Sequence, residues 1–409
     1  MTTNNAVAPR FDQRRLARIG SVLEQRYVRS GRLPGFRMML ATSRQIVFDH
    51  CAGFADIERQ VPMQPDTIFR IHSMTKPFTS LLLMMLVEEG LVGLDDPVHR
   101  ILPPFRRLKM TPGSAPDGTM TVAPLTGPMR VVDLLRHTSG LTYAVQGDTA
   151  TATMHRKQKL GLRDGPTGDE LIQALADIPL DFSPGDAWNY SIATDVIGCI
   201  IERVTGQDLS TVMRERLWVP LGLRDTHFFV PDEKADRLAA CYALTRDGRL
   251  ELQDDPLNSA YRAPPHHASG GGGLVSTGPD YMRFCQMLLN NGVHDGEYLV
   301  SPNTIRRMRA NHLPGGADLR QMSRALFSET TYTGVGFGLG FAVTMQPERT
   351  LMAGSAGDYF WGGMASTSFW VDPVEGFTCV FLTQLIPSDT YPLRRDTREL
   401  VHAALLPSG

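Results

Sequence analysis

The sequence has few cysteines, few lysines and no long apolar run. Its five cysteines are scattered and mostly embedded in apolar segments, at positions 51, 199, 241, 285 and 379. An odd, scattered set indicates buried reduced thiols and excludes a disulfide framework, and it shows no metal-ligand spacing. The longest apolar stretch, Leu81 to Val87, is far too short to span a bilayer and predicts a core helix.

An excess of charge of one sign is also absent. The formal net charge is −2 over 409 residues, and no run of lysines or arginines occurs. This balance argues against nucleic acid and against an anionic membrane as the main partner. The first ten residues lack the apolar core that an export signal needs, so we expect a cytoplasmic protein.

The order of apolar patterns along the chain predicts an α+β fold. A helical pattern and a strand hairpin come first, helical patterns fill the middle, and strand-like runs return after Gly334. This order predicts one sheet that is built from both ends of the chain, with a mainly helical domain inserted. The predicted sheet domain comprises residues 1–65 and 330–409, and the predicted helical domain comprises 66–329.

Individual elements follow from the same patterns. The stretch from Lys109 to Pro128 is rich in proline and glycine and has little periodicity, so it predicts a long surface loop. Thr167-Gly168-Asp169-Glu170 is a capping-box sequence and predicts a helix start. The predicted strands are 36–42, 45–51, 335–343, 350–353, 365–371 and 378–382, and the predicted helices are 11–27, 73–89, 131–135, 167–176, 195–204, 277–291, 301–310 and 394–405.

Ser73 and Lys76 form the only Ser-x-x-Lys motif in the chain, where a strand-like run gives way to an apolar helix. A serine hydroxyl is a weak nucleophile until a neighbouring group takes its proton, and a lysine can do so only when it is partly deprotonated. Three-residue spacing on a helix places both side chains on one face. The positive helix end and the loss of water both disfavour the lysine cation. The alternative is a helix-capping serine beside a solvated lysine.

Two further segments are compatible with an activated serine. Tyr190 stands just before a helical pattern, and its phenol becomes a usable base only beside a cation, which Lys76 could supply. The alternative is a tyrosine that packs its ring under the next helix. The paired glycines of Trp361-Gly362-Gly363-Met364 let the backbone approach a ligand closely, although this segment taken alone would be a turn.

A series of short motifs runs in order along most of the chain. They are Phe69-Arg70 leading into Ser73-Met74-Thr75-Lys76-Pro77, His137-Thr138-Ser139-Gly140-Leu141, Phe182-Ser183-Pro184-Gly185 leading into Tyr190-Ser191, Ser269-Gly270-Gly271-Gly272-Gly273-Leu274, Gly336-Phe337-Gly338-Leu339-Gly340 and Trp361-Gly362-Gly363. With these motifs the chain resembles the serine hydrolases of the class C β-lactamase type, and within them the family VIII carboxylesterases and related acyltransferases. The resemblance implies a penicillin-binding-protein-like fold, in which helices flank an antiparallel sheet and a mainly helical domain is inserted.

The resemblance also implies a Ser–Lys–Tyr acyl transfer site. Ser73 would attack a carbonyl carbon, while Lys76 and Tyr190 would share the acid and base work. Which of the two takes the first proton stays open, because coupled groups titrate as a pair. In the family the oxyanion hole is formed by the N–H groups of the nucleophile and of the residue after the third motif, which are here those of Ser73 and Met364. We expect no cofactor and no metal ion.

The chain departs from the β-lactamase pattern at two places. Ile192 occupies the position of an amide-binding asparagine, and Trp361-Gly362-Gly363 replaces Lys-Thr-Gly, whose lysine helps to hold a carboxylate. The loss of an amide-binding group and a cation, with the gain of an indole, favours neutral, apolar acyl groups. We therefore predict a carboxylesterase or acyltransferase for short to medium acyl esters. The predicted substrate-binding residues are Trp361, Gly362, Gly363 and Ile192.

Two alternative functions remain at this point. One is a β-lactamase, a D-amino-acid peptidase or an amide hydrolase on the same machinery, against which Ile192 and the missing export signal argue. The other is a catalytically silent binding domain, against which the intact Ser73, Lys76 and Tyr190 argue. The sequence leaves open whether water or an alcohol receives the acyl group, and it leaves open the oligomeric state.

Three other features favour structural roles. His266-His267 has no further ligand at a helical spacing, so a loop pair is favoured over a metal site. His137 is expected to support a turn near the site. The glycine run 270–273 lacks the Gly-Lys-Ser/Thr of a phosphate loop, and it indicates flexible or closely packed backbone beside the cleft.

Overall fold

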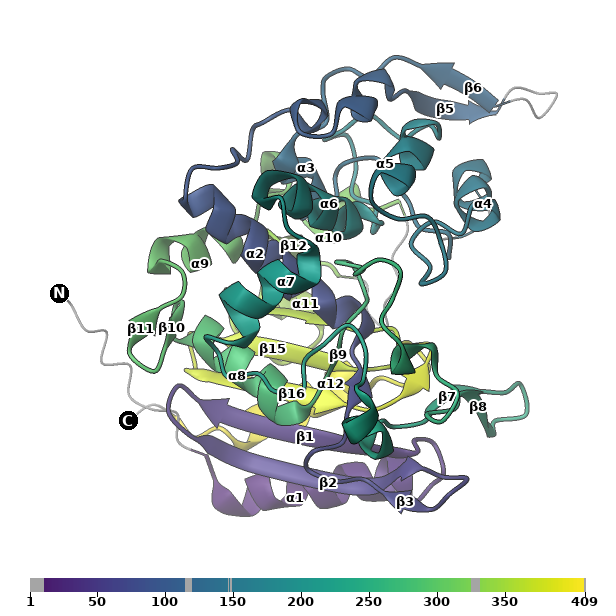
Figure 1. The fold of residues 1–409 in the computed structure, drawn as a ribbon. Coiled ribbons are helices and arrows are strands. Elements are labelled where there is room, and N and C mark those ends of the chain that lie inside the picture. The colour runs from purple at the N-terminus through teal and green to yellow at the C-terminus, as the bar shows by residue number, and fades with distance from the viewer. Residues whose placement is uncertain (1–10, 115–119, 146, 148, 325–331, 408–409) are drawn as a thin grey trace.

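Both ends of the chain enter one eight-stranded sheet in the computed structural model, which describes residues 11–114, 120–145, 147, 149–324 and 332–407 (Figure 1). All neighbouring strands in this sheet are antiparallel. The first ten residues, on which the expectation about export rests, lie outside the described residues. In spatial order the strands are β12 (Val335–Phe337), β13 (Ala342–Thr344), β14 (Tyr359–Gly362), β15 (Ser368–Asp372), β16 (Phe377–Leu382), β1 (Gly35–Thr42), β2 (Ile46–Asp56) and β3 (Val61–Pro62).

The helices cover the sheet and form a further layer beyond it (Figure 1). Several begin where a side chain accepts a backbone N–H of the first turn, as Thr277 does for α8 and Ser301 for α9. The α-helices are α1 (Gln13–Leu23), α2 (Lys76–Glu88), α3 (Val131–Leu135), α4 (Ala150–Lys157), α5 (Gly168–Ala176), α6 (Ala193–Thr205), α7 (Leu209–Met213), α8 (Gly278–Leu289), α9 (Pro302–Met308), α10 (Leu319–Met322), α11 (Pro347–Thr350) and α12 (Leu393–Ala404).

The sheet is covered on both faces, and two neighbours on β15 show how. Successive side chains of a strand point to opposite faces. Phe369 contacts Tyr281 of α8, with ring centroids 5.2 Å apart, whereas the next residue, Trp370, lies 5.1 Å from the Arg398 guanidinium of α12. All residues of β15 and β16 are buried, because helices lie on both sides. This two-sided burial explains why both strands read as continuous apolar runs.

Helix α2 runs through the centre of the helical layer and contacts α6 and α7. It is buried over almost its whole length, since its sequence is apolar on all sides after Lys76. The helix stops at Gly90, whose φ of +74° suits a left-handed helix end. Its N-terminal end carries Lys76, and the turn before it contacts β14 of the main sheet. The predicted nucleophile motif therefore lies where the two layers meet.

The predicted surface loop at 109–128 was wrong, because this segment forms the hairpin β5–β6 at the outer edge of the helical layer (Figure 1). An irregular register between Met110 and Gly113 accommodates the proline and the glycine that suggested a loop. Residues 115–119 lie outside the described part. The smaller sheets are β4 (Phe69–Arg70) with β9 (Val275–Ser276), β5 (Met110–Ser114) with β6 (Met120–Ala123), β10 (Val293–His294) with β11 (Glu297–Tyr298), and β17 (Leu385–Ile386) with β7 (Cys241–Leu244) and β8 (Leu250–Asp254).

Other local predictions also need correction. The run 335–343 is two strands, because Gly340 has a φ of +100° and lets the chain reverse. Residues 350–353 do not form a strand, since Pro347 starts the short helix α11, which extends to Thr350. Strand β14 was not predicted. Thr167 is the N-cap residue of α5, but its side chain makes no capping hydrogen bond.

Helix α8 belongs to the sheet layer, although its residues fall within the predicted helical domain 66–329. It packs against β1, β15 and β16, with Tyr281 among the residues that face the sheet. The boundary near residue 330 lies outside the described residues. The division into two domains stays a prediction.

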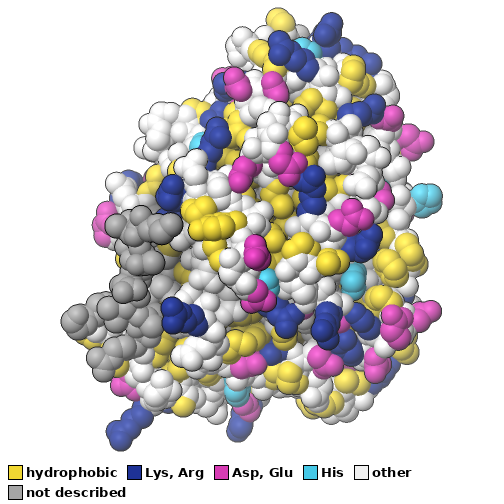
Figure 2. All heavy atoms as spheres, turned by 60° about the vertical axis from the view of Figure 1, so that its left-hand side comes forward, with side chains coloured by type: hydrophobic (Ala, Val, Ile, Leu, Met, Phe, Trp, Pro, Cys, Tyr) yellow, Lys and Arg dark blue, Asp and Glu magenta, His cyan; other side chains and the backbone are white. Residues whose placement is uncertain are grey.

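Charged side chains of both signs are interspersed on the face that Figure 2 shows, in keeping with the net charge of −2. Within the described ranges, no helix is long and apolar enough to cross a membrane. The same part of the chain holds no group of three or more His, Cys, Asp or Glu side chains arranged to bind a metal ion.

Candidate active site

Ser73 lies in a tight turn between strand β4 and helix α2. The turn is a 3-10 helix over His72–Thr75, and the α-helix itself begins at Lys76. His72 has a φ of +44°, a conformation that costs a residue with a side chain about 1–3 kcal/mol and persists only where the surroundings enforce it. The nucleophile motif is therefore held on a constrained backbone.

Arg70 fixes the strand that leads to Ser73. Its side chain is 1% exposed, and its Nε donates to Asp254 over 2.7 Å. The two Nη atoms donate to the carbonyl of Ala239 at 2.5 Å and to the hydroxyl of Ser259 at 3.0 Å. Charge-assisted bonds in several directions leave a buried guanidinium little freedom. This anchor holds β4, and with it the start of the turn.

Lys76 is buried, with 2% of its surface exposed, and its ammonium has three acceptors. Its Nζ lies 3.3 Å from Ser73 Oγ, 3.0 Å from the phenol oxygen of Tyr143 and 2.6 Å from the carbonyl oxygen of Gly271. It also lies 4.7 Å from the ring centre of Tyr190. Three donors and three acceptors match, so the ammonium is fully satisfied without water. The alternative of a solvated lysine is excluded by this burial.

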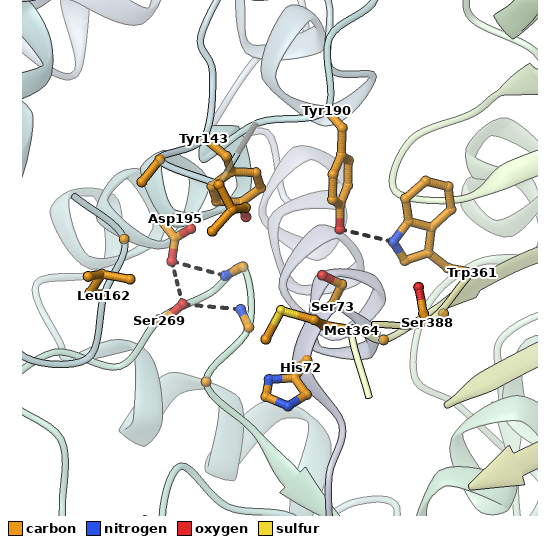
Figure 3. Close-up of a pocket in the computed structure, with 18 of the residues that line it drawn as sticks. His72, Ser73, Tyr143, Leu162, Tyr190, Asp195, Ser269, Trp361, Met364 and Ser388 are labelled. Atoms are coloured by element: carbon orange, nitrogen blue, oxygen red, sulfur yellow. Dashed lines mark hydrogen bonds between the residues drawn. The ribbon is translucent and has the colours of Figure 1, made fainter. Parts of the chain in front are cut away.

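Tyr190 precedes helix α6 and faces the nucleophile. Figure 3 shows that its phenol oxygen points toward Ser73 and receives a hydrogen bond from the indole of Trp361. The Trp361 Nε1 to Tyr190 Oη distance is 3.2 Å. Because the phenol oxygen accepts this N–H, its own proton is directed elsewhere. Tyr190, Trp361 and Ser73 are thus brought together from three distant segments.

The end of β14 passes close to the turn that carries Ser73. Gly363 donates its N–H to the carbonyl of Thr367 at 2.8 Å. A Cβ atom on Gly363 would lie 2.5 Å from the carbonyl oxygen of Ile71, so only glycine allows this approach. Met364 follows, lines the cavity and is 45% exposed. Because its position is set by this approach, the backbone of Met364 lies beside the nucleophile segment.

Ile192 does not line the cavity in the described part of the chain. It is fully buried at the N-cap of α6, and its Cδ1 lies 3.0 Å from where a Cβ on Gly161 would stand. Gly161 itself lines the cavity. Ile192 therefore packs behind the wall, where an apolar side chain is favoured by the helical core.

Tyr143 and Asp195 belong to the site but do not stand out in the sequence. Tyr143 follows the His-Thr-Ser-Gly motif in a loop, and Asp195 lies in the first turn of α6. Burial, then the charges of Asp195 and Tyr190, raises the pKa of Tyr143 well above its usual value, so its phenol stays neutral. The sequence signal that could have identified Tyr143 is its position two residues after the motif His137–Leu141.

Two histidines near the lysine are neutral. Burial, and then the neighbouring Arg70 charge, lowers the pKa of His72 to about 4. Burial, and then the Lys76 charge, lowers the pKa of His137 well below its usual value. The His137 ring lies 4.9 Å from the ring of Tyr190, and its Nδ1 lies 3.3 Å from the Ser191 hydroxyl. His137 therefore packs under Tyr190, as expected of a supporting residue.

Ser73 opens into a cavity of about 520 Å³. Leu160 and Leu171 line its wall on the side of the helical layer, and Phe360 and Trp361 line it on the side of the sheet. The exposed rim carries Asp389 but is partly apolar, because three large apolar side chains of the lining are more than two-fifths exposed. They are Val145, Leu162 and Met364.

The sequence of this chain matches a known family. A family model described as Beta-lactamase matches residues 22–404. The chain belongs to the beta-lactamase family. Within this family, protein Rv1367c of Mycobacterium tuberculosis is 35% identical over 363 residues, which are 88% of this chain and 87% of that protein. Esterase EstB of Burkholderia gladioli is 31% identical over 386 residues, which are 90% of each chain.

Solved structures confirm the predicted fold of the beta-lactamase and penicillin-binding-protein type. EstCE1, described as a hydrolase with promiscuous acyltransferase activity, superposes with a TM-score of 0.79 at 28% identity and covers 95% of this chain and 99% of its own. Simvastatin synthase LovD from Aspergillus terreus superposes with a TM-score of 0.79 at 25% identity and covers 95% of this chain and 97% of its own. The predicted resemblance to esterases and acyltransferases of this family is confirmed.

Proposed function

We propose that the protein cleaves carboxylic esters through an acyl-enzyme on Ser73. Membership of the beta-lactamase family, with an esterase at 31% identity over 90% of both chains, makes it a serine ester hydrolase. The observation that carries the mechanism is the buried Lys76 ammonium, which lies 3.3 Å from Ser73 Oγ and 4.7 Å from the ring centre of Tyr190. A nucleophile with a cation and a phenol at this range can lose its proton on attack.

In the first half of the reaction, Ser73 Oγ attacks the ester carbonyl carbon and forms a new C–O bond. The hydroxyl proton passes to the pair of Lys76 and Tyr190, which must first have lost one proton between them. The N–H groups of Ser73 and Met364 would hold the oxyanion, and donors of this kind contribute about 2.7–4 kcal/mol each in comparable sites. The bond to the alcohol then breaks, and the leaving oxygen takes the proton back from the pair.

In the second half, water or an alcohol attacks the acyl carbon. The same pair removes the proton of the attacking oxygen and returns it to Ser73 Oγ as the acyl bond breaks. EstCE1 is described as a hydrolase with promiscuous acyltransferase activity, and the open, partly apolar rim here leaves room for an alcohol beside the acyl group. Acyl transfer to an alcohol is therefore our second candidate function.

The apolar walls of the cavity favour a short to medium acyl chain without charge. Leu160, Leu162 and Leu171 line the side next to the helical layer. Trp361 stands at the position where class C β-lactamases carry a lysine that helps to bind a substrate carboxylate. Its indole N–H donates to the Tyr190 phenol oxygen. A neutral ester fits this surface better than a charged lactam or peptide.

The test uses p-nitrophenyl esters of butyrate, octanoate and laurate with wild type, Ser73→Ala and Ser21→Ala. Ser21 is an exposed serine whose hydroxyl donates to its own helix, so it offers the same chemical change at a remote site. We expect a pre-steady-state burst and an acyl adduct by intact mass in wild type and Ser21→Ala, and neither in Ser73→Ala. Added ethanol that raises turnover above hydrolysis would show transfer. A burst that persists in Ser73→Ala would refute Ser73 as the nucleophile.

A further inference from the structure

Asp195 is a buried carboxylate that sits behind the lysine of the site. It is 2% exposed, and in the described part of the chain it makes no ion pair within 4.0 Å. Its Oδ1 accepts a hydrogen bond from the Ser269 hydroxyl at 2.5 Å and from the Gly271 N–H at 3.1 Å. A buried carboxylate without a directly paired cation is costly unless it serves nearby charge.

The loop that Asp195 holds is the loop that binds Lys76. Figure 3 shows Asp195 bonded to Ser269 and to the backbone of the loop, and Ser269 bonded to a further backbone N–H. That second donor is Gly272, at 3.1 Å from the Ser269 hydroxyl. The carbonyl oxygen of Gly271 then accepts from Lys76 Nζ at 2.6 Å. One residue, Gly271, therefore separates the carboxylate from the ammonium.

Asp195 also stands close to one of the two phenols beside Lys76. A Cβ on Gly271 would overlap Asp195 Oδ2 and would lie 2.9 Å from the phenol oxygen of Tyr143. The carboxylate, the loop and Tyr143 are thus packed against one another. Tyr190 is the second phenol beside the lysine; its ring centre lies 5.6 Å from that of Tyr143, and its phenol oxygen accepts from the Trp361 N–H.

We propose that Asp195 is a positioning residue, whose charge holds the Lys76 ammonium on the Gly271 carbonyl and keeps Tyr143 a neutral phenol. Tyr190 is then the phenol that exchanges a proton with Ser73. The proposal rests on the proposed function, because it assigns roles within the acyl transfer site. The carboxylate acts through the lysine and the loop and does not touch the substrate.

Other titratable groups lie near this cluster, among them Tyr261, whose hydroxyl donates to the Gly272 carbonyl at 3.5 Å and whose pKa is raised by burial. On its own helix Asp195 has Cys199, whose thiol pKa is raised by burial and then by nearby carboxylates. His72 and His137 lie near Lys76, in the turn before α2 and in the loop after α3, and both are neutral because burial lowers their pKa values. The charge on which Asp195 acts in this proposal is therefore that of Lys76.

The experiment is the pH dependence of kcat/KM for p-nitrophenyl butyrate in Asp195→Asn. The asparagine side-chain oxygen can still accept hydrogen bonds from Ser269 and Gly271, so the substitution removes the negative charge and keeps the shape of the side chain. Attack by Ser73 needs a base that has lost its proton, and a nearby negative charge favours the protonated form of a base. Removal of the carboxylate is therefore expected to move the acidic limb, the fall of kcat/KM at low pH, to lower pH by roughly one unit. An acidic limb that stays in place would overturn the proposal.

The control is Asp280→Asn, which removes a carboxylate of the same kind. Asp280 is buried, and its Oδ2 also accepts from one backbone N–H, that of Asp225 at 2.7 Å, and from one hydroxyl, that of Thr226 at 3.0 Å. It does not line the cavity among the described residues. We expect the acidic limb of the pH profile of Asp280→Asn to lie at the same pH as that of wild type.

A second variant keeps the proposal testable if Asp195→Asn does not fold. Ser269→Ala keeps the charge of Asp195 and removes the two hydrogen bonds of the Ser269 hydroxyl, so we expect kcat to fall about tenfold while the acidic limb stays in place. A limb that moves in Ser269→Ala would contradict an effect of charge. No burst and no adduct in wild type would instead refute the proposed function itself, whatever the pH profiles show.

Discussion

The indole N–H of Trp361 donates a hydrogen bond to the phenol oxygen of Tyr190 over 3.2 Å. Trp361 comes from strand β14 and Tyr190 from the segment before α6, so the bond joins the sheet to the helical layer across the cavity. Trp361 therefore both lines the cavity and contacts Tyr190. It orients the phenol that we propose as a base and stabilises negative charge on its oxygen.

Trp361→Phe is expected to lower kcat about tenfold, because a hydrogen bond to a group that becomes charged contributes roughly 1.5 kcal/mol or more. KM should change less, since the phenyl ring keeps much of the cavity wall. The control is Trp218→Phe, which removes a buried indole whose N–H has no partner among the described residues. Steady-state kinetics with p-nitrophenyl butyrate measure kcat and KM of both variants. Equal losses in the two variants would show that the effect is packing alone.

The two phenols beside Lys76 are expected to differ in their importance. Tyr190→Phe should lower kcat by a factor of about 10²–10⁴, as removal of a general base or acid does. Tyr143→Phe removes an acceptor 3.0 Å from Lys76 Nζ and should cost only about tenfold. The variants are isosteric and serve as each other's control. A larger loss in Tyr143→Phe than in Tyr190→Phe would reverse the proposed assignment.

Much of this site could be predicted from the sequence because its motifs are local. Ser73 and Lys76 are three residues apart, and the helix that follows is apolar on all sides, so chemistry and burial can both be read from one segment. Asp195 and Tyr143 could not be predicted in this way. Their roles arise from contacts with a glycine loop about 75–130 residues away in the chain, and no local pattern encodes such a contact.

The fold shows the same limit. The sheet from both chain ends followed from the order of patterns, since two-sided burial leaves apolar strands such as β15 and β16. Strand β14 was missed because Trp361 and its glycines resemble a turn, and its strand partners lie elsewhere in the chain. The hairpin β5–β6 was missed because Pro112 and Gly113 suggest a loop until the register irregularity that accommodates them is seen.

Gly271→Ala is expected to lower kcat about a hundredfold, because a displacement of about 1 Å in a positioned group costs this much. The added Cβ would overlap Asp195 Oδ2 and crowd the Tyr143 phenol, so the loop must shift and carry its carbonyl away from Lys76. The matched control is Gly272→Ala, whose Cβ would find its nearest neighbour, the carbonyl carbon of His72, at 3.9 Å. Similar activity in both variants would show that the loop position does not matter.

His155 should make stability depend on pH below neutrality. It lies on α4, is 2% exposed, and its Nδ1 has no hydrogen-bond partner among the described residues. Burial lowers the pKa of His155 to about 4. In the unfolded chain the imidazole has its ordinary pKa near 6.5, so between pH 6.5 and 4 the unfolded state binds a proton that the folded state does not. Stability is therefore complete above pH 6.5 and is lost as the pH falls toward 4.

At pH 5 this difference corresponds to about 2 kcal/mol for His155 alone. His155→Phe removes the titration, so its free energy of unfolding in urea should fall less between pH 7 and pH 5 than that of wild type. The control is His266→Phe, a change of the same kind at an exposed position, which should keep the pH dependence of wild type. If His155→Phe and wild type lose the same stability on acidification, the buried imidazole of His155 is not the group that senses pH. Carboxylates and other histidines must then account for the dependence of stability on pH.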